Sequence, residues 1–221
     1  MEGILEYGMV RLYYVVPEVG HAVSACYVHG TKEMAQRLAK VLEGRQTGVF
    51  AIEGEDWNAD LSPWSAPAVF KGETDFAGGA DVYLDLLCNR VIPQTEETLG
   101  LNVVRRGLMG YSLAGLFSVY AMYKTALFSE IASVSGSLWY DGFVEFMQER
   151  TVFCKPQKVY FSVGRKEKKT RNRRMAGVEE CTLKAKARLE EEGISCFFEI
   201  NEGNHFYQVE ERMEKAAEYL F

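Results

Sequence analysis

Short apolar runs alternate with segments of helical periodicity along almost the whole chain, and this alternation limits the folds that the chain can adopt. The apolar runs are rich in β-branched and aromatic residues and predict strands; they cover residues 12–16, 22–28, 49–53, 103–109, 131–134, 159–163 and 196–200. The segments that predict helices cover residues 32–42, 80–91, 113–123, 141–148, 178–191 and 208–220. Parallel strands need crossover helices, so the pattern predicts an α/β fold with a mostly parallel central sheet and helices on both faces.

The size of the chain fits one such domain. With 221 residues, 48% of them hydrophobic, we expect a single domain over residues 1–221 without a separate lid domain. The net charge of −6 argues against nucleic acid as a partner. No apolar run approaches the ~20 residues of a membrane span, so we expect no membrane as a partner either. The first residues lack the pattern of a secretory signal, and five scattered cysteines are typical of reduced thiols in the cytoplasm. The oligomeric state stays open.

One serine stands among small and apolar residues in the sequence RRGLMGYSLAGLFSVY, which covers residues 105–120. Ser112 lies where the strand predicted over residues 103–109 gives way to the next helix. A nucleophile elbow occupies this kind of turn and needs small residues two before and two after the nucleophile. Gly110 and Ala114 meet that requirement, although Ala114 replaces the last glycine of the G-x-S-x-G motif. Ser112 is therefore a candidate nucleophile; the alternative is that it only caps the helix.

Only three histidines could serve as the base for such a nucleophile. His21 precedes a predicted strand and His29 ends one, whereas His205 lies in the sequence EGNHFY between the last predicted strand and the final helix. A base in that loop can reach over the edge of the sheet toward Ser112, and the chain order serine, acid, histidine is that of α/β-hydrolase triads. We take His205 as the candidate general base; a helix-capping or solvent-facing histidine is the alternative.

Five segments carry a resemblance to a known family. They are CYVHGT (residues 26–31), VIPQTEETLG before the elbow strand, GYSLAG, FSEIASVSGSLWY (residues 128–140) and EGNHF. In this order they resemble the esterase D-like branch of the α/β-hydrolase family, which also includes feruloyl esterases and enterobactin-type siderophore esterases. The resemblance covers nearly the whole chain. It implies a Ser-His-acid hydrolase that cleaves ester or thioester bonds of a small molecule through an acyl-enzyme on Ser112, without implying which substrate.

An acyl-transfer site needs two preorganised N–H donors for the charge that grows on the former carbonyl oxygen. The amide of Leu113, directly after the candidate nucleophile, is the expected first donor. The fold assigns the second donor to the loop after the strand predicted over residues 22–28, where His29, Gly30 and Thr31 stand, and we favour the Thr31 amide. The same residues also fit a turn in which Thr31 caps the next helix, and both interpretations can hold together.

The fold places the triad acid on the loop after the strand predicted over residues 159–163, in the sequence GRKEKKTRNRR. Glu167 is the only carboxylate there and is the candidate acid. Two alternatives stay open: Glu167 can be a surface residue among basic neighbours, or the site can work as a Ser112–His205 dyad, as in some related siderophore esterases. A basic run is more often a solvated face than a binding site; here it comprises Arg165, Lys166, Lys168, Lys169, Arg171, Arg173 and Arg174.

A long irregular segment over residues 54–79 is the candidate substrate-binding region. It resembles the segment that lines the acyl or alcohol pocket in these esterases, and the candidate contacts in it are Trp57, Asn58 and Trp64. The tryptophans can equally pin the loop onto the core. The acidic residues near the start of this segment have no histidine or cysteine close to them in sequence, so we expect no metal and no cofactor.

Two other functions remain open on the same scaffold. An acyltransferase would pass the acyl group to an alcohol or thiol instead of water, and a non-catalytic binding protein would have kept the fold and lost the chemistry. The second alternative predicts a damaged triad, whereas Ser112 and His205 both stand where the fold requires them. The sequence therefore favours an ester hydrolase.

Overall fold

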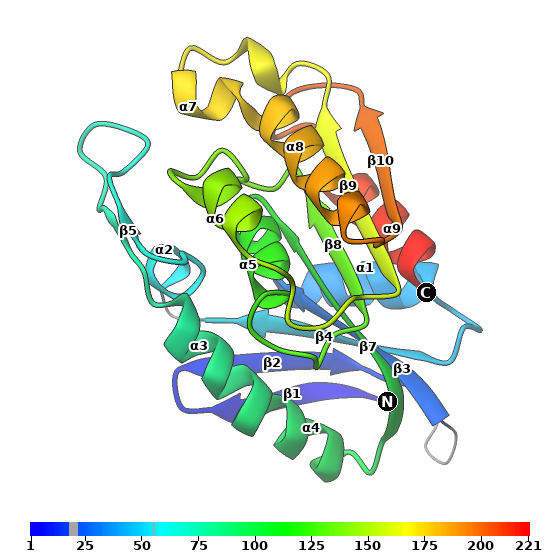
Figure 1. Cartoon of the computed structure of the whole chain (residues 1–221). Coiled ribbons are helices and arrows are strands. Elements are labelled where there is room, and N and C mark those ends of the chain that lie inside the picture. The colour runs from blue at the N-terminus through cyan, green and yellow to red at the C-terminus, as the bar shows by residue number, and fades with distance from the viewer. Residues whose placement is uncertain (18–21, 55) are drawn as a thin grey trace.

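An eight-stranded sheet runs through the centre of the molecule (Figure 1). The computed structural model describes residues 1–17, 22–54 and 56–221. The strand order is β1-β2-β4-β3-β7-β8-β9-β10; β2 pairs antiparallel with both β1 and β4, and all other neighbours are parallel. The strands are β1 (Glu2–Tyr7), β2 (Val10–Val15), β3 (Ala22–His29), β4 (Thr47–Glu53), β7 (Asn102–Tyr111), β8 (Glu130–Val134), β9 (Lys158–Gly164) and β10 (Cys196–Asn201). A small separate hairpin joins β5 (Ser65–Ala66) and β6 (Phe76–Ala77).

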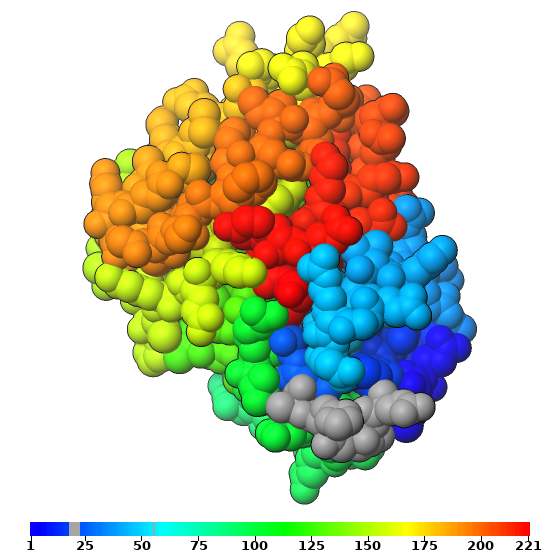
Figure 2. All heavy atoms as spheres, turned by 90° about the vertical axis from the view of Figure 1, so that its right-hand side faces the viewer, coloured from blue at the N-terminus to red at the C-terminus, as the bar shows by residue number. Residues whose placement is uncertain are grey.

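Helices cover both faces of this sheet, as the alternation in the sequence predicts. On one face α1 (Lys32–Val41) and α9 (Val209–Leu220) lie side by side, and Figure 2 shows α9 in red next to α1 in light blue. On the other face α5 (Leu113–Ala121) is buried along its whole length. The helices that accompany it are α3 (Ala80–Leu86), the π-helical turn η1 (Leu87–Val91), α4 (Ile92–Thr98), α6 (Phe143–Glu149) and α8 (Val178–Glu191). Each face therefore has its own hydrophobic core.

Two of the longer elements differ from the sequence prediction, and the short elements at residues 57–60, 65–66, 76–77, 167–169 and 173–176 were not predicted at all. The edge strand β1 has alternating exposure and carries Glu2 and Glu6, so it lacks the apolar run that marks the other strands. The helix predicted over residues 80–91 continues to Thr98, because a π-helical turn precedes Pro93, which lacks the N–H that a regular helix uses. Both differences lie away from the strand ends that matter for the site.

The carboxyl ends of the parallel strands lie level at one edge of the sheet. Tyr111 at the end of β7 pairs with Val134 at the end of β8, and Gly164 at the end of β9 pairs with Asn201 at the end of β10. The loops that leave these strands carry the elbow serine, the VSGSLWY segment, the basic run and the EGNHFY segment in turn. Because α/β sheets bind ligands outside this edge, the chain brings all of its candidate residues to the expected side.

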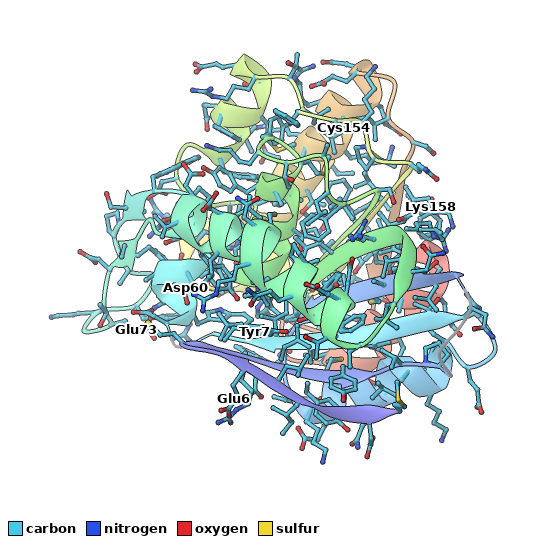
Figure 3. All side chains as sticks on the ribbon, turned by 90° about the horizontal axis from the view of Figure 1, so that it is seen from below. Glu6, Tyr7, Asp60, Glu73, Cys154 and Lys158 are labelled. Atoms are coloured by element: carbon cyan, nitrogen blue, oxygen red, sulfur yellow. The ribbon has the colours of Figure 1, made fainter. Side chains whose placement is uncertain are left out.

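Within the described ranges, no helix is both long and apolar enough to cross a membrane. All five cysteines are free thiols. The exposed Cys154 lies well apart from Glu73 in Figure 3. Among the residues that the structure describes, no group of three His, Cys, Asp or Glu side chains could hold a metal ion. His21 lies outside the described residues.

Candidate active site

The turn between β7 and α5 holds Ser112 in a backbone conformation that few residues adopt, with φ of 57° and ψ of −120°. Strain of this kind persists only where the surroundings enforce it. A Cβ at Gly110 would lie 2.3 Å from the backbone carbon of Ala114, and one at Gly115 would lie 2.9 Å from the Cα of Gly136. The methyl group of Ala114, the departure from the G-x-S-x-G motif, is fully buried here. Small residues thus let β7 and α5 approach closely and keep the serine at the tip of the turn.

Three of the candidate residues lie in one hydrogen-bonded line. The Nε2 atom of His205 is 3.1 Å from Ser112 Oγ, and its Nδ1 atom is 2.8 Å from Glu167 Oε2. An imidazole with its proton on Nδ1 donates to the carboxylate and accepts the hydroxyl proton of the serine. The His205 side chain is 16% exposed, so it is shielded from bulk water on most sides. The structure therefore brings together three side chains from distant parts of the chain.

Glu167 is buried among hydrogen-bond donors and is not solvated with its basic neighbours. It begins the short 3-10 helix η2 (Glu167–Lys169), and its side chain is 4% exposed. Its Oε1 accepts hydrogen bonds from Ser135 Oγ at 2.7 Å and from the Gly164 amide. Burial raises the pKa of this carboxyl group, but the hydrogen bond and charge of His205, with the bonds from Ser135 and Gly164, outweigh burial and hold the pKa below its usual value. The surface role that the sequence left open for Glu167 does not fit this environment.

Arg212 on α9 is a residue that the sequence analysis missed. Its side chain is buried, with 1% of the residue exposed. Nη1 donates to Ser135 Oγ at 3.0 Å and to Glu167 Oε1 at 3.1 Å. Nη2 donates to the backbone carbonyls of Glu202 at 2.7 Å and Asn204 at 2.9 Å, which precede the candidate base. One guanidinium group thus ties the acid to the loop of the histidine.

The signal for Arg212 in the sequence is its place on the helix. It stands on the buried face of α9, next to Met213 and one turn before Ala216. A charged side chain rarely lies on a buried helix face unless it is paired, so an arginine at this position indicates a buried acceptor. The sequence does not say which acceptor, because Glu167 lies 45 positions earlier.

The VSGSLWY segment and Tyr111, the residue before the serine, make further hydrogen bonds around the candidate site. The hydroxyl of Tyr111 donates to the backbone carbonyl of His205, and the two rings lie 5.1 Å apart. The Ser137 amide donates to the Ser112 carbonyl at 2.9 Å, and the hydroxyl oxygens of these two serines are 3.4 Å apart. Ser135, which contacts the acid, has a positive φ of 48°. The elbow is therefore connected directly to the loop of the histidine and to the segment after β8.

Both candidate oxyanion donors lie at the start of a helix. Leu113 is the first residue of α5, and Thr31 directly precedes α1 with φ of −89° and no side-chain cap hydrogen bond. Strand β3 lies next to β7, with Val28 paired to Met109. The loop after β3 therefore lies level with the elbow that carries Ser112. The capping role considered for the Thr31 hydroxyl is not seen.

A pocket of about 180 Å³ opens beside Ser112, and we call it the serine pocket. Trp57 and Asn58, which begin the short helix α2 (Trp57–Asp60), line it as the sequence predicts. Its lining also includes Trp139 from the VSGSLWY segment, which the sequence analysis did not single out. The pocket therefore receives side chains from the long irregular segment and from the loop after β8.

Trp64 has a different place from the one expected for a substrate contact. It is not in the lining of the serine pocket. Its Nε1 donates to the Asp141 carbonyl at 2.9 Å, and its ring packs 5.9 Å from Tyr140 and 5.5 Å from Phe146. Trp64 therefore pins its loop onto the core, which is the second role that the sequence allowed.

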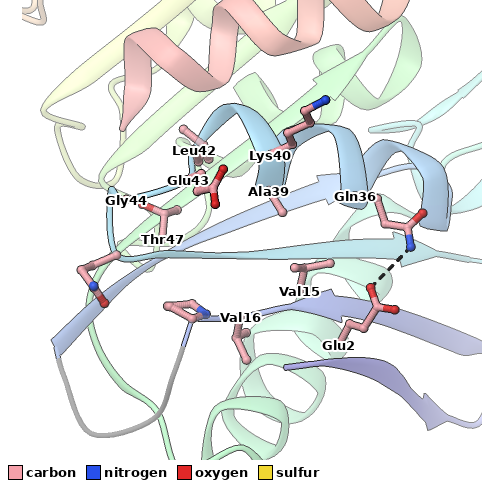
Figure 4. Close-up of a pocket in the computed structure, with 12 residues that line it drawn as sticks. Glu2, Val15, Val16, Gln36, Ala39, Lys40, Leu42, Glu43, Gly44 and Thr47 are labelled. Carbon is pink, nitrogen blue, oxygen red and sulfur yellow. Dashed lines mark hydrogen bonds between the residues drawn. The ribbon is translucent and has the colours of Figure 1, made fainter.

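A larger hollow of about 530 Å³ lies between β2 and α1 (Figure 4). Val15 and Ala39 line it, and Gln36 donates to Glu2 at 3.4 Å at its edge. None of its lining residues belongs to the hydrogen-bonded line at Ser112. Size alone therefore does not mark the site.

Comparison with known proteins identifies the family. The family model described as "Putative esterase" matches residues 23–209. An uncharacterized Bacillus subtilis protein, YbbA, is 32% identical over 155 residues, which make up 65% of this chain and 61% of that protein. This chain thus spans about three fifths of the length of that curated relative. The chain belongs to the putative esterase family.

Solved structures show the same fold at low sequence identity. The siderophore hydrolase EstA from Aspergillus nidulans has a TM-score of 0.79 at 18% identity, over 100% of this chain and 93% of that one. An IroE-like serine hydrolase from Shewanella oneidensis has a TM-score of 0.81 at 17% identity, over 100% and 79% of the two chains. A ferulic acid esterase has a TM-score of 0.63 at 13% identity, over 100% and 95%. The predicted α/β-hydrolase fold is confirmed.

Proposed function

We propose that this chain is a serine ester hydrolase with Ser112 as nucleophile, His205 as general base and Glu167 as triad acid. The observation that carries the proposal is the hydrogen-bonded line from Ser112 Oγ through the His205 ring to Glu167 Oε2, with distances of 3.1 and 2.8 Å. A binding protein that had lost the chemistry would be free to lose any of these three side chains. A dyad would have no need of a buried carboxylate aimed at Nδ1.

In the acylation step, His205 Nε2 takes the proton of the Ser112 hydroxyl as Oγ attacks the ester carbon. The carbonyl π electrons move to the oxygen, which becomes the oxyanion of a tetrahedral intermediate. When the intermediate collapses, the bond to the alcohol oxygen breaks, and the imidazolium of His205 gives its proton to that oxygen. Glu167 holds the ring in the required tautomer and stabilises the imidazolium without taking the proton itself.

In the deacylation step, water takes the place of the alcohol. His205 removes a proton from the water as its oxygen attacks the acyl carbon, and the proton returns to Ser112 Oγ when the bond to the serine breaks. The products are one carboxylic acid and one alcohol. A second alcohol or a thiol in place of water would make the chain an acyltransferase, and product analysis with added acceptors separates the two reactions.

The amides of Leu113 and Thr31 are the proposed donors to the oxyanion. We expect Thr31→Ala to have little effect on kcat, because only the backbone donor is used. The φ of −89° at Thr31 lies just outside the range of about −80° to −50° that proline adopts, so a small backbone adjustment accommodates the substitution. Thr31→Pro should therefore fold but lower kcat by ~10²-fold, the usual cost of losing one such donor. Full activity in a folded Thr31→Pro variant would place the second donor elsewhere.

The acyl part of the substrate is proposed to be short or aromatic. The serine pocket has a volume of about 180 Å³, which leaves little room for a long acyl chain. Trp57 and Trp139 offer flat walls that suit an aromatic group. Efficient turnover of long-chain triglycerides would contradict this assignment.

We further propose that residues 1–221 act as one catalytic domain in the cytoplasm. The sheet that carries the site takes strands from β1 to β10, so its ends cannot be separated into independent units. The five cysteines are free, as is usual in a reducing compartment. Two measurements test these assignments: the number of unfolding transitions tests the single domain, and fractionation of the native protein tests the compartment.

The proposed chemistry is tested with short p-nitrophenyl esters and a fluorophosphonate label. The parent chain should release p-nitrophenol and become labelled at one serine. Ser112→Ala should abolish the label and lower kcat by about 10⁶-fold, as expected for removal of a triad nucleophile. Ser65→Ala, at an exposed serine of the β5–β6 hairpin, is the matched control and should change neither. Unchanged turnover by a folded Ser112→Ala variant would end the proposal.

A further inference from the structure

A second pocket, of about 400 Å³, adjoins the His205 ring without being lined by Ser112, and we call it the histidine pocket. The two pockets share five lining residues, so they are neighbouring compartments of one site: Phe70, Trp139, Met175, His205 and Phe206. The residues that line only the histidine pocket come chiefly from the basic segment after β9 and from the loop of the histidine. The proposed reaction steps do not yet say which part of the substrate this pocket holds.

If the proposed function is correct, the proton transfers indicate which pocket holds the acyl part of the ester and which holds the alcohol part. His205 gives its proton to the alcohol oxygen, so the alcohol part has to lie against the His205 ring. The acyl part stays bonded to Ser112 and lies next to Leu113. His205 lines both pockets, but Ser112 and Leu113 line only the serine pocket, so the serine pocket receives the acyl part and the histidine pocket receives the alcohol part.

Some basic residues of the segment after β9 form ion pairs, and others do not. Lys166 and Lys169 line the histidine pocket, are exposed, and make no ion pair within the described part of the chain. Arg171 and Arg173 make none there either, but neither lines the pocket. The other three basic residues are paired outside it: Arg165 with Glu202 at 2.8 Å, Lys168 with Glu179 at 2.9 Å and Arg174 with Asp141 at 3.0 Å.

Glu167, the carboxylate that lines the same pocket, does not neutralise the charges of Lys166 and Lys169. Glu167 has Oε2 on His205 and Oε1 on Ser135, the Gly164 amide and Arg212. Both of its oxygens therefore serve the buried network. The wall of the pocket carries two positive charges that are open to a ligand.

The rest of the wall is apolar and held in place. Phe206 is 80% exposed and Phe70 is 53% exposed, so both rings offer a surface that a ligand could cover. The segment of Phe70 is tied to the basic segment by three hydrogen bonds: Asn172 Nδ2 donates to the Val69 carbonyl at 2.9 Å, and Arg174 Nη1 donates to the carbonyls of Pro67 at 2.8 Å and Ala68 at 3.3 Å. The aromatic wall and the lysine wall therefore face one compartment as a unit.

We propose that the histidine pocket binds an alcohol part that is aromatic or apolar and carries a negative charge, either a carboxylate or a phosphate, which Lys166 and Lys169 recognise. The rings of Phe70, Trp139 and Phe206 hold its apolar body. Glu73, which lines the serine pocket, repels the same charge and so sets the orientation of the substrate. The substrate class is an ester of a small anionic alcohol.

The test compares esters that share an acetyl group and differ in the alcohol part. 4-Acetoxybenzoate carries a carboxylate, 4-acetoxybenzamide is its neutral isostere, and 4-acetoxyphenyl phosphate carries a phosphate. Each kcat/KM is divided by the rate constant of hydroxide-catalysed hydrolysis of the same ester, which removes differences between the leaving groups. We expect one of the anionic esters to exceed the amide by ~10-fold, with the advantage reduced in high salt because the lysines are exposed. The better anion identifies the group that the pocket reads.

Variants then locate the effect. The double variant Lys166→Met, Lys169→Met should lose the preference, so that the normalised kcat/KM of the anionic ester falls to that of the neutral amide measured with the same variant. Lys168→Met removes an adjacent lysine that is paired with Glu179 and does not line the pocket, so it should keep the preference. A carboxylate on the acyl part, in monophenyl terephthalate compared with phenyl benzoate, should bring no advantage.

The outcomes separate this proposal from the proposed function. Equal normalised kcat/KM for the charged and neutral esters in the parent overturns the anionic subsite and leaves the esterase intact. A preference that survives in the double variant, or that Lys168→Met abolishes equally, also overturns it. If the parent hydrolyses none of these esters and Ser112 takes no fluorophosphonate, the proposed function falls and this proposal falls with it.

Discussion

The two parts of the candidate site are held by different forces. The elbow, residues 110–115, is fixed by close contact, since a Cβ on Gly110 would lie 2.3 Å from the backbone carbon of Ala114. The acid–base corner, by which we mean Glu167, His205 and Arg212, is fixed by hydrogen bonds between segments far apart in the sequence. The elbow is thus a local packing problem, and the corner is a tertiary network of charges and donors.

This difference predicts different sensitivities. Repulsion between overlapping atoms rises steeply, so the elbow should tolerate no added atom but should be indifferent to charge. A buried hydrogen-bond network should tolerate small changes of shape, but it should respond strongly when a charge or a donor is lost. Substitutions in the elbow and in the acid–base corner should therefore differ in both size and kind of effect.

Gly110→Ala should have the largest effect, because the new methyl group meets backbone that cannot move away. We expect a loss of about 3 kcal/mol or more in the free energy of unfolding, and loss of fluorophosphonate labelling of Ser112. Gly177→Ala is the matched control, since a Cβ there makes only ordinary contacts at 3.4 Å and beyond. Urea unfolding followed by circular dichroism measures both variants. A Gly110→Ala variant as stable and active as the parent would show that the elbow is not fixed by packing.

Glu167→Gln should leave the fold intact and lower kcat strongly. The amide keeps the size of the side chain but cannot stabilise the imidazolium of His205, and an analogous triad change costs ~10⁴-fold. Glu202→Gln is the control, because that carboxylate makes only an exposed ion pair with Arg165. The measurement is kcat on one ester at saturating substrate. Similar kcat in the parent and in Glu167→Gln would favour a Ser112–His205 dyad.

Arg212→Lys should have a smaller effect of the same kind. Lysine keeps the charge but has three donors on one atom for the four acceptors that Arg212 contacts. We therefore expect His205 to shift slightly and kcat to fall by ~10²-fold or less with KM unchanged. In a Glu167→Gln background the same change should cost much less, because both act through the histidine. Arg37→Lys, at an exposed ion pair between α1 and α9, is the control. Equal losses in both backgrounds would make the role of Arg212 merely structural.

The smallest effect should appear in acid stability. The pKa of Glu167 in the folded chain lies below its ordinary value of 4.5, so the folded state binds this proton less readily than the unfolded state does. Its contribution to stability is present above pH 4.5 and is lost as the pH falls through the folded pKa. The difference in unfolding free energy between the parent and Glu167→Gln should therefore shrink between pH 7 and the acid range. A difference that grows on acidification would contradict the lowered pKa.

Much of the fold could be predicted because its signals are local. The parallel strands and their helices show in short windows, since a strand buried on both faces must be apolar along its length. The edge strand β1 escaped because it is half-exposed and carries Glu2 and Glu6. The π-helical turn before Pro93 escaped because it depends on how the helix packs.

The candidate site divides in the same way. Ser112 could be found because its neighbours must be small, and His205 because few histidines compete for its place. Trp64 and Trp57 look alike in the sequence, and only the structure separates one that packs in the core from one that lines the serine pocket. Arg212 could not be assigned a partner, since nothing near it in the sequence indicates Glu167.

Local sequence patterns were enough to predict the parallel strands and their helices, the turn at Ser112, and the strand ends near which Glu167 and His205 lie. These features follow from steric and hydrophobic patterns that act over a few residues. Other features exist only in the folded chain: Glu167 is buried, Arg212 joins it to the loop of His205, and Lys166 and Lys169 line a pocket while Lys168 does not. The strength of an electrostatic interaction depends on the distance between the two groups. These residues are far apart in the sequence, so they come close to one another only when the chain has folded.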